Sequence, residues 1–424
     1  MIKFLLKGLI RDKSRSRLPV IVVAIGVMLT VMLHAYIKGI MGDIVEMNAK
    51  FSSGHVKVMT KAYAENMTQV PNDLALLNSG RLLKDLENKF PGMDWEQRIQ
   101  FGGLIDAPDE NGETKAQGPS LGIGLDLLSP GTKEPDRLNL VKSLVRGNMP
   151  GKKGEVLISE EFSRKLNVNP GDTITFIGST MNGSMTLYNF IVSGTLSFGT
   201  EVLDRGTVIA DIEEVRNALD MTDAAGEILG FFKNGFYDDE IAVQNAGLFN
   251  SAYSRDPDEF APVMKTLSQQ GSMGQYVKLT DNLANYIAMV FVFAMSLVLW
   301  NAGLLGGLRR YGEVGIRLAM GENKGHVYRT MIYESVIIGL AGSVIGTLIG
   351  LFFAWLIQKY GIDISGLMKS SSIMMPTILR THIMPIDFYI GFMPGLLSTV
   401  IGTMLSGVGI YRRQTAKLFK ELEA

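Results

Sequence analysis

The sequence LPVIVVAIGVMLTVMLHAYI occupies residues 18–37 and contains no aspartate, glutamate, lysine or arginine. A helix needs about 20 mostly apolar residues to cross the hydrocarbon core of a bilayer. Three further windows without these charged residues, each at least as long, lie at residues 283–308, 335–358 and 388–411. Each window is apolar on every helical face, which indicates lipid rather than a half-wet surface. The sequence therefore predicts four transmembrane helices, because the buried helices of soluble proteins have shorter apolar runs.

The composition fits a chain that lies partly in lipid and partly in water. Hydrophobic residues make up 46% and charged residues 20% of the 424 residues, which is too polar for a protein that lies wholly in the membrane. The net charge of −1 gives no electrostatic footprint for nucleic acid, so we expect no nucleic-acid partner. The absence of cysteine excludes disulfides, thiol catalysis and thiolate metal sites.

The first window follows a basic leader, residues 1–17, and two interpretations of this arrangement are open. A basic leader before an apolar stretch is typical of a cleaved signal peptide. The stretch is long for a signal, however, and no small-x-small cleavage site follows it. The sequence therefore favours an uncleaved membrane anchor.

Lysine and arginine near the ends of the spans predict the orientation. These residues are frequent at 1–17, 309–334 and 412–424, whereas the loop 359–387 has only three of them. With four spans, the three basic segments fall on one side of the membrane. We therefore expect a multi-pass protein with both termini in the cytoplasm, and with residues 38–282 and 359–387 outside.

The outer segment, residues 38–282, is long enough to bury a core of its own. Ser159 has the position of an N-cap for a short helix that ends at Leu166. Strands are predicted at residues 53–60, 154–158, 173–177, 187–192 and 208–210. A second helix is predicted at 212–219, and a hairpin turn at Asn111-Gly112. The predicted class is α+β, with a smaller subdomain inserted at about residues 120–235.

Both ends of the outer segment have a helical pattern. Residues 38–51 place apolar side chains at helical spacing, and residues 257–282 also favour helix. Because each piece adjoins a span, each is either a stalk that extends the transmembrane helix outward or an ordinary core helix of the outer domain. The pattern does not separate the two.

The sequence has no pattern of an active site. No two of its four histidines stand at metal-ligand spacing, and it contains neither a G-x-S-x-G nucleophile elbow nor a G-x-x-x-x-G-K-[ST] phosphate loop. We therefore expect a non-catalytic chain, without a metal site, that does not itself hydrolyse ATP.

The most informative segment is the short loop RRYGEVGIRLAMGENK at residues 309–324, between the second and third windows. It is followed by a glycine-rich third window, in which Gly342, Gly346 and Gly350 recur every four residues. Small residues at this spacing allow two membrane helices to approach closely. The three glycines therefore predict a helix-packing face.

This loop resembles the FtsX-like permease domain of the MacB/FtsX/Lol superfamily of ABC proteins. The matching elements are Arg309-Arg310, the segment 313–321, and Glu334 before the glycine-rich window. The layout of one span, a large outer domain and three more spans also matches, and residues 155–209 are similar to a MacB-like periplasmic core. The tail departs from many members because it lacks proline. The resemblance implies a type VII ABC permease in a bacterial inner membrane.

The resemblance also implies partners and a mechanism. Two permease chains, identical or homologous, would each rest on a cytoplasmic ABC ATPase, which would bind ATP and magnesium while this chain binds no cofactor. The ATPase would act through mechanotransmission, with the loop 309–334 as the coupling segment. The residues expected to dock are Arg310, Glu313, Val314, Ile316, Arg317, Met320, Gly321 and Glu322. By pattern alone, a helix on the membrane surface fits equally well.

Three functions follow from the resemblance. Gly26, Gly39 and the strand at 54–56 are similar to the start of Lol-type permeases, which favours extraction of lipoproteins, with or without a periplasmic acceptor. Export of peptides or hydrophobic toxins is the first alternative. A regulator that only activates a periplasmic partner is the second, although the large outer segment argues against it.

A cleft for an acyl chain is expected between the first and second windows. Flexible apolar side chains could line it, namely Met28, Met32, Met289 and Met295. Ordinary packing against other helices or lipid explains these methionines equally simply.

Overall fold

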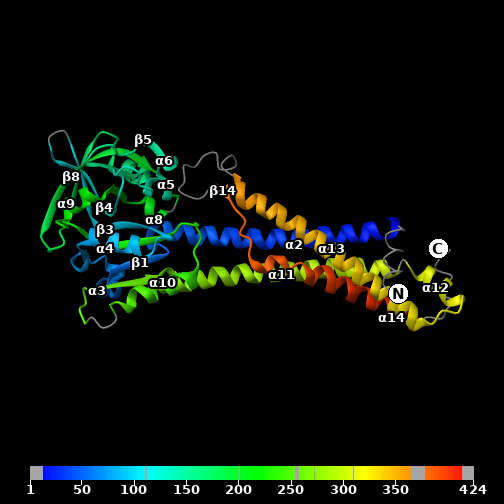
Figure 1. Cartoon of the computed structure of the whole chain (residues 1–424). Coiled ribbons are helices and arrows are strands. Elements are labelled where there is room, and N and C mark those ends of the chain that lie inside the picture. Colours follow the sequence, from blue (N-terminus) through cyan, green and yellow to red (C-terminus); the bar gives the residue numbers. More distant parts are fainter. Residues whose placement is uncertain are drawn as a thin grey trace. The chain divides into compact units, whose positions relative to one another are not determined.

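The computed structural model describes residues 13–109, 112–199, 201–253, 257–271, 273–308, 310–363 and 378–412 (Figure 1). The chain divides into two compact units. The helical unit contains the described residues up to Asp43, Leu279–Asp363 and those from Ile378 onward. The α+β unit contains Ile44–Lys278. Most of the predicted leader and tail, Arg309 and most of the methionine-rich part of loop 359–387 lie outside the described residues.

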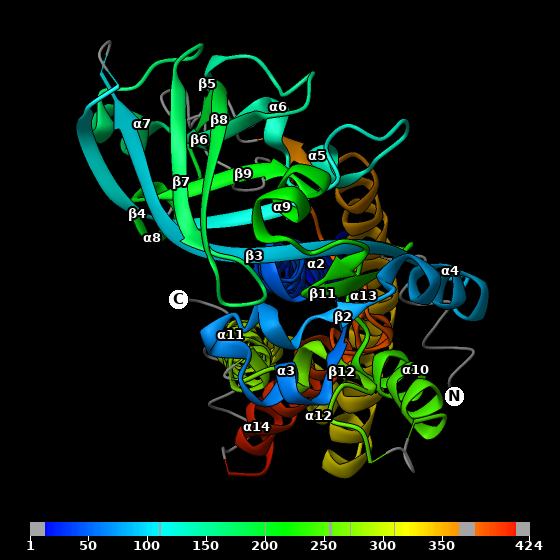
Figure 2. The ribbon, with the colours of Figure 1, turned by 90° about the vertical axis from the view of Figure 1, so that its left-hand side faces the viewer.

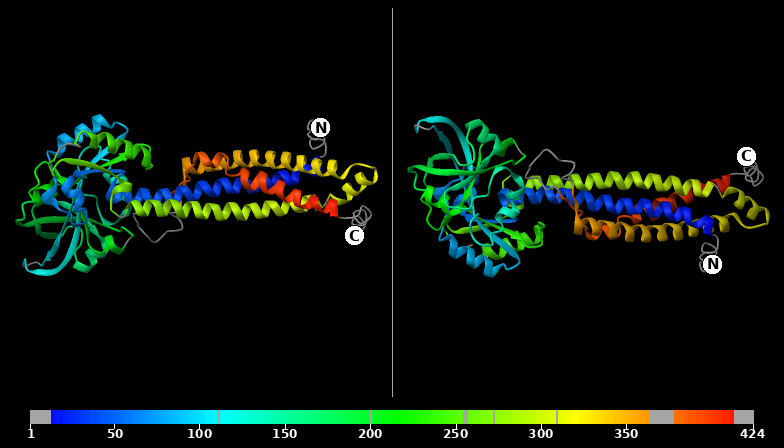
Figure 3. Two further views of the ribbon diagram at one scale, coloured as in Figure 1. Left: turned by 90° about the horizontal axis from the view of Figure 1, so that it is seen from below. Right: turned by 90° about the horizontal axis from the view of Figure 1, so that it is seen from above.

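Within the described residues, four helical stretches are long and apolar enough to cross a membrane, which confirms the four predicted spans (Figure 3). The helices run further than the apolar windows that predict them. The elements are α2 (Lys13–Asn48), α11 (Met273–Leu308), α12 (Tyr311–Ala319), α13 (Lys324–Tyr360), η5 (Pro385–Phe388), η6 (Met393–Ser398) and α14 (Thr399–Arg412), with the short strands β13 (Ile362–Asp363) and β14 (Ile378–Leu379) between α13 and η5.

Hydroxyl side chains in these helices bond to their own helix. Thr30 donates to the carbonyl of Gly26, and Thr399 and Thr403 donate to the carbonyls of Gly395 and Thr399. A side chain bonded in this way needs no water, so threonine is tolerated in the hydrocarbon region.

The α+β unit is built on one mixed sheet. Among the described residues the sheet has ten strands, in the order β12-β1-β11-β3-β4-β9-β6-β8-β5, with β7 paired to β3 and β8. Its strands are β1 (Val56–Thr60), β3 (Met93–Pro108), β4 (Thr114–Leu125), β5 (Leu144–Gly147), β6 (Glu155–Ser159), β7 (Thr173–Ser179), β8 (Met185–Leu196), β9 (Thr207–Asp211), β11 (Glu227–Phe232) and β12 (Pro262–Thr266). Two further strands, β2 (Leu76–Leu77) and β10 (Ala224–Ala225), pair with each other in a separate small sheet. The helices are α3 (Lys61–Glu65), α4 (Ser79–Lys89), α5 (Glu134–Arg137), α6 (Leu140–Ser143), α7 (Glu160–Leu166), α8 (Glu201–Asp204), α9 (Ile212–Leu219) and α10 (Asp239–Ser251).

The long strand β3 divides this unit into two lobes (Figure 2). Its first half pairs with β11, which pairs with β1, and its second half pairs with β4 and β7. The predicted subdomain at about residues 120–235 overlaps the second lobe but does not have the same bounds. It leaves out the part of β3 that belongs to the second lobe, and it includes β11, which belongs to the first.

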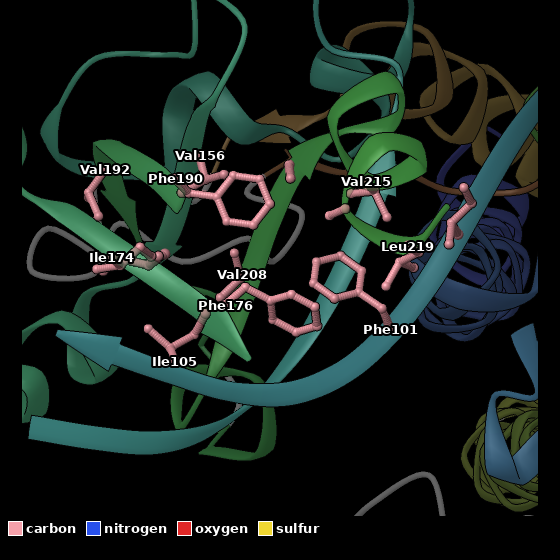
Figure 4. Close-up of a cluster of buried hydrophobic side chains, with 14 of the residues drawn as sticks. Phe101, Ile105, Val156, Ile174, Phe176, Phe190, Val192, Val208, Val215 and Leu219 are labelled. Carbon is pink, nitrogen blue, oxygen red and sulfur yellow. The ribbon is translucent and has the colours of Figure 1, made fainter. Parts of the chain in front are cut away.

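Each lobe has its own hydrophobic core. In the second lobe, Phe101 and Phe176 meet edge to face, with their ring centroids 5.1 Å apart (Figure 4). Val156 and Ile158 of β6 point into this core, whereas Leu157 points into a second cluster on the other face. Side chains of a strand alternate between faces, so an all-apolar strand such as β6 is buried on both.

Several local predictions are confirmed, one of them only in part. The Ser159 hydroxyl accepts from the amide of Phe162 and begins α7, as expected for an N-cap. The helical pattern at 38–51 is also real, because α2 continues to Asn48 and is followed by a π-helical turn. Residues 257–282 are helical only in their second part. Residues 262–266 form β12, paired along its whole length with β1, whereas α11 begins at Met273 and extends the second span outward.

Candidate coupling site and helix packing

Helix α12 has one buried face and one open face. The side chains of Tyr311 and Val314 are 5% and 2% exposed, and they pack against Val327 and Met331 of α13. The hydroxyl of Tyr311 also donates to the carbonyl of Ser406 in α14. These contacts hold α12 against the ends of two transmembrane helices.

Two ion pairs fix the ends of α12. The guanidinium of Arg310, just before the helix, pairs with Glu334 of α13. In the last turn of α12, Arg317 donates through two nitrogens to the carboxylate of Glu322, which lies just beyond the helix, at 2.6 and 2.7 Å. The hydrogen bonds from Arg317 lower the pKa of Glu322 below its ordinary value. This pair therefore stays charged and bidentate at neutral pH.

The chain turns sharply after α12. Gly321 has a φ of +91°, which favours glycine, and the next helix begins at once. The Asn323 side chain caps α13 by accepting from the amide of Gly325. The fixed turn, together with the two ion pairs, gives α12 a defined position on the helical unit.

Two side chains form what we call the α12 apolar edge, namely Ile316 and Met320. They are 45% and 75% exposed. The structure thus separates the residues expected to dock. Ile316 and Met320 are accessible, whereas Val314 is buried against α13, on the opposite face of the helix from Ile316. In this arrangement Val314 supports α12 from behind, and docking of the other expected residues stays a prediction.

The glycine face of α13 packs against α2 of the same chain. A Cβ at Gly342 would lie 2.6 Å from the Cβ of Val23, and one at Gly346 would lie 2.5 Å from the carbonyl oxygen of Ala24. At Gly350 the nearest atom is the Cβ of Val31, at 3.0 Å. At Gly342 and Gly346 the two helices are therefore too close for a side chain, and at Gly350 an added Cβ would fit only if α2 shifted slightly.

Residues 285–415, which hold α12, α13 and α14, match the model of the family described as FtsX-like permease C-terminal. The chain therefore carries an FtsX-like permease C-terminal domain at these residues. This match confirms the superfamily that the loop at 309–324 predicted, and with the four spans and the inserted α+β unit it supports the type VII permease fold. A permease of this kind is a non-catalytic membrane component of an ABC system and works with a cytoplasmic ABC ATPase.

One solved structure similar to this permease is the periplasmic region of MacB from Actinobacillus actinomycetemcomitans. The likeness has a TM-score of 0.35 at 12% sequence identity, and it covers 55% of this chain and 95% of the other. A comparison with curated proteins found no match.

The four methionines predicted to line an acyl cleft differ in their surroundings. Met295 reaches the Gly26 position of α2, where its Cε lies 3.1 Å from a Cβ built there. Met289 is 66% exposed, and Met28 and Met32 are partly buried. A cavity of about 1080 Å³ does occur in the helical unit, but none of the four methionines lines it. Its walls include Val22, Gly303, Arg310 and Thr403.

An unpredicted polar contact lies among the transmembrane helices. The Nδ1 atom of His34 in α2 lies 2.6 Å from a carboxylate oxygen of Asp387 in η5, and both residues are buried. The second carboxylate oxygen accepts from the amide of Met384 at 2.7 Å. An ionisable residue within a span marks a site worth testing. The sequence shows both residues, but only the fold shows that they meet.

Replacing Asp387 by leucine should destabilise the helical unit, because His34 and the Met384 amide would lose their acceptor. A buried polar group left without a partner costs about 1–3 kcal/mol, which thermal unfolding in detergent would detect. The matched control is Asp281→Leu, because Asp281 pairs with Lys38 through a side chain that is 64% exposed. An exposed pair contributes only about 0–1 kcal/mol. Equal unfolding temperatures for the two variants would contradict a structural role of the buried pair.

Proposed function

We propose that this permease transmits ATP-driven movement from a separate ATPase to its α+β unit, and that the movement extracts lipoproteins from a bacterial inner membrane. The observation that carries the first part is the α12 apolar edge, an accessible pair of apolar side chains on a helix that two ion pairs hold in place. A short helix with exposed apolar residues between charges fits a groove on a partner. In this proposal α12 lies in the cytoplasm, together with both termini.

The mechanism needs no catalytic group on this chain. Among the described residues, no cluster of histidine and carboxylate side chains could hold a metal ion. ATP and magnesium are bound by the ATPase, of which two copies serve two permease chains, identical or homologous. Support comes from the family match, because permeases of this kind work with such an ATPase.

The choice of lipoprotein as cargo rests on the sequence similarity to Lol-type permeases around Gly26, Gly39 and residues 54–56. The structure adds a physical reason for one of these glycines. A Cβ at Gly39 would lie 1.9 Å from the carbonyl oxygen of Arg380, so this position admits no larger residue. Efflux of peptides or hydrophobic toxins, and regulation of a periplasmic partner, remain the alternative functions.

Mass spectrometry of proteins that co-purify with this permease from gently solubilised native membranes tests the proposal. An ATPase together with lipoproteins is the expected result. An ATPase with an adaptor or outer-membrane channel would replace the cargo assignment by efflux, and an ATPase with a cell-wall hydrolase would replace it by regulation. Repeated preparations without any ATPase would overturn the coupling role itself.

A further inference from the structure

A buried arginine of the α+β unit forms hydrogen bonds with the turn at the end of α2. After Asn48 the helix widens into the π-helical turn η1 (Ala49–Ser53), which ends at Gly54 with a φ of +61°. Arg98 of β3, which is 1% exposed, donates to the carbonyls of Lys50 and Phe51 in this turn, at 2.8 and 2.7 Å. The last carbonyls of a helix lack partners within it, so Arg98 replaces water there and also complements the negative end of the helix dipole.

A second layer of charges holds Arg98 itself. Its Nε donates to Glu134 at 2.8 Å, and the Glu134 side chain is fully buried. Arg137 also pairs with Glu134, donates to Glu96 at 3.1 Å, and lies over the ring of Phe231 at 4.2 Å from its centroid. The pKa of Glu96 is raised by burial and by the nearby charge of Glu134, although Arg137 opposes both effects. We call Arg98, Glu134 and Arg137 the Arg98 clamp.

A histidine beside the clamp ties the same helix end to the sheet. His55 is fully buried, and its Nδ1 accepts from the amide of Phe232 at 2.9 Å. Because Nδ1 is an acceptor, the proton of the neutral ring lies on Nε2, which is 2.7 Å from the carboxylate of Glu46 in α2. The helix end is therefore bonded to β11 as well as to β3.

The start of α11 reaches this place too. Val45 and Ala49 of the α2 end form a buried cluster with Leu267, and Val277 of α11 packs against it. The side chain of Gln270 donates to the carbonyl of Ser53 at 3.1 Å. Both helices that enter the α+β unit are thus fastened within a few residues of each other.

We propose that the Arg98 clamp is the joint through which α2 moves the α+β unit, and that the π-helical turn it holds is the element that changes. The inference rests on the proposed mechanism and adds the residues that carry it. A π-helical turn is rare and is frequently found at functional sites. Three directed bonds to this turn and to Glu134 transmit a displacement of α2 to β3, whereas apolar packing alone would allow it to slip. Arg98 is a positioning residue in this assignment.

The test is hydrogen–deuterium exchange of the full chain in complex with its co-purified ATPase, with and without ATP and magnesium. In the unmodified complex, ATP should change deuterium uptake in the sheet beyond Gly54. In Arg98→Met, the ATP-dependent change should disappear from β3, while β11, which His55 also connects to α2, keeps part of it and the rate of ATP hydrolysis persists. Glu134 keeps its partner Arg137 in this variant, so no buried charge is left alone.

The control removes a buried ion pair from the same sheet but not from the joint. Lys57 and Glu227, on β1 and β11, lie 2.8 Å apart and are both buried, so the double variant Lys57→Met, Glu227→Gln should retain the full response to ATP. If Arg98→Met does not fold, Arg98→Lys decides, because it keeps the charge without the planar fork that serves three acceptors, and its response should be reduced.

The experiment distinguishes failure of the proposed mechanism from failure of the role assigned to the Arg98 clamp. No response to ATP in the sheet of the unmodified complex would remove the proposed mechanism. A full response in the unmodified complex and in the Arg98 variants would leave the mechanism standing and overturn the assignment of the clamp.

Discussion

Aspartate at both positions of the α12 apolar edge, Ile316→Asp with Met320→Asp, is expected to release the ATPase from the complex. Apolar anchors of an interface each contribute about 2 kcal/mol or more, and loss of one such anchor weakens binding by roughly 30-fold. A charge at the same place adds a desolvation cost to the lost contact. The loss should be complete in a co-purification experiment, with no ATPase retained on the tagged permease.

The fold should survive this double change, because both side chains are already exposed and contribute little to the packing of α12. Two controls separate binding from folding. Val202→Asp makes the same chemical change at a side chain of the α+β unit that is 82% exposed, and the ATPase should stay bound. Val314→Asp should instead lower the unfolding temperature, since Val314 is buried against α13. An ATPase that remains bound to the double variant would show that α12 is not the docking element.

For α12, the sequence predicted the position of the helix but not which of its faces is buried. The loop motif was enough to locate α12 and to suggest the superfamily, because the spacing of charges and glycines can be read directly from the sequence. The sequence grouped Val314 with Ile316, but a helix turns by about 100° per residue, so the two side chains lie on nearly opposite faces and only that of Ile316 is exposed. Which face is buried depends on α13, and the sequence does not show where α13 lies. Apolar side chains on both faces of a short helix leave this choice open.

The α+β unit shows a similar limit. Short strands such as β6 were predictable from their composition and from the N-cap that follows. The helical expectation for 257–282 holds from Met273 onward but not at 262–266. There β12 lies at an edge of the sheet and gains its strand conformation from pairing with β1, which is a long-range contact. Arg98 could not be recognised at all. A single arginine in a polar strand has the composition of a surface residue, and only the meeting of β3 with the end of α2 makes it buried.

The sequence predicted that the glycine face of α13 is a packing surface, but it did not predict which helix packs there. Glycines spaced by four residues show that one helix face is small, and they do not identify the neighbouring helix. The structure brings α2 against it, and this leads to a sharp expectation. Gly346→Ala should destabilise the helical unit, although alanine is the better helix former by about 1 kcal/mol. The new Cβ would meet the backbone oxygen of Ala24 at 2.5 Å, and a backbone atom of a packed helix cannot move aside alone.

Overpacking of this kind costs about 1–3 kcal/mol, and occasionally more, which exceeds the gain in helix propensity. The matched control is Gly306→Ala in α11, where no atom lies within 4 Å of the new Cβ, so only the propensity term acts and stability should rise slightly or stay the same. Thermal unfolding of both variants in detergent separates the two effects by their sign. A Gly346→Ala variant as stable as Gly306→Ala would mean that α2 does not pack on this face. The residues next to the stripe, Val23, Val27 and Val31, would then have to be buried by something other than α13.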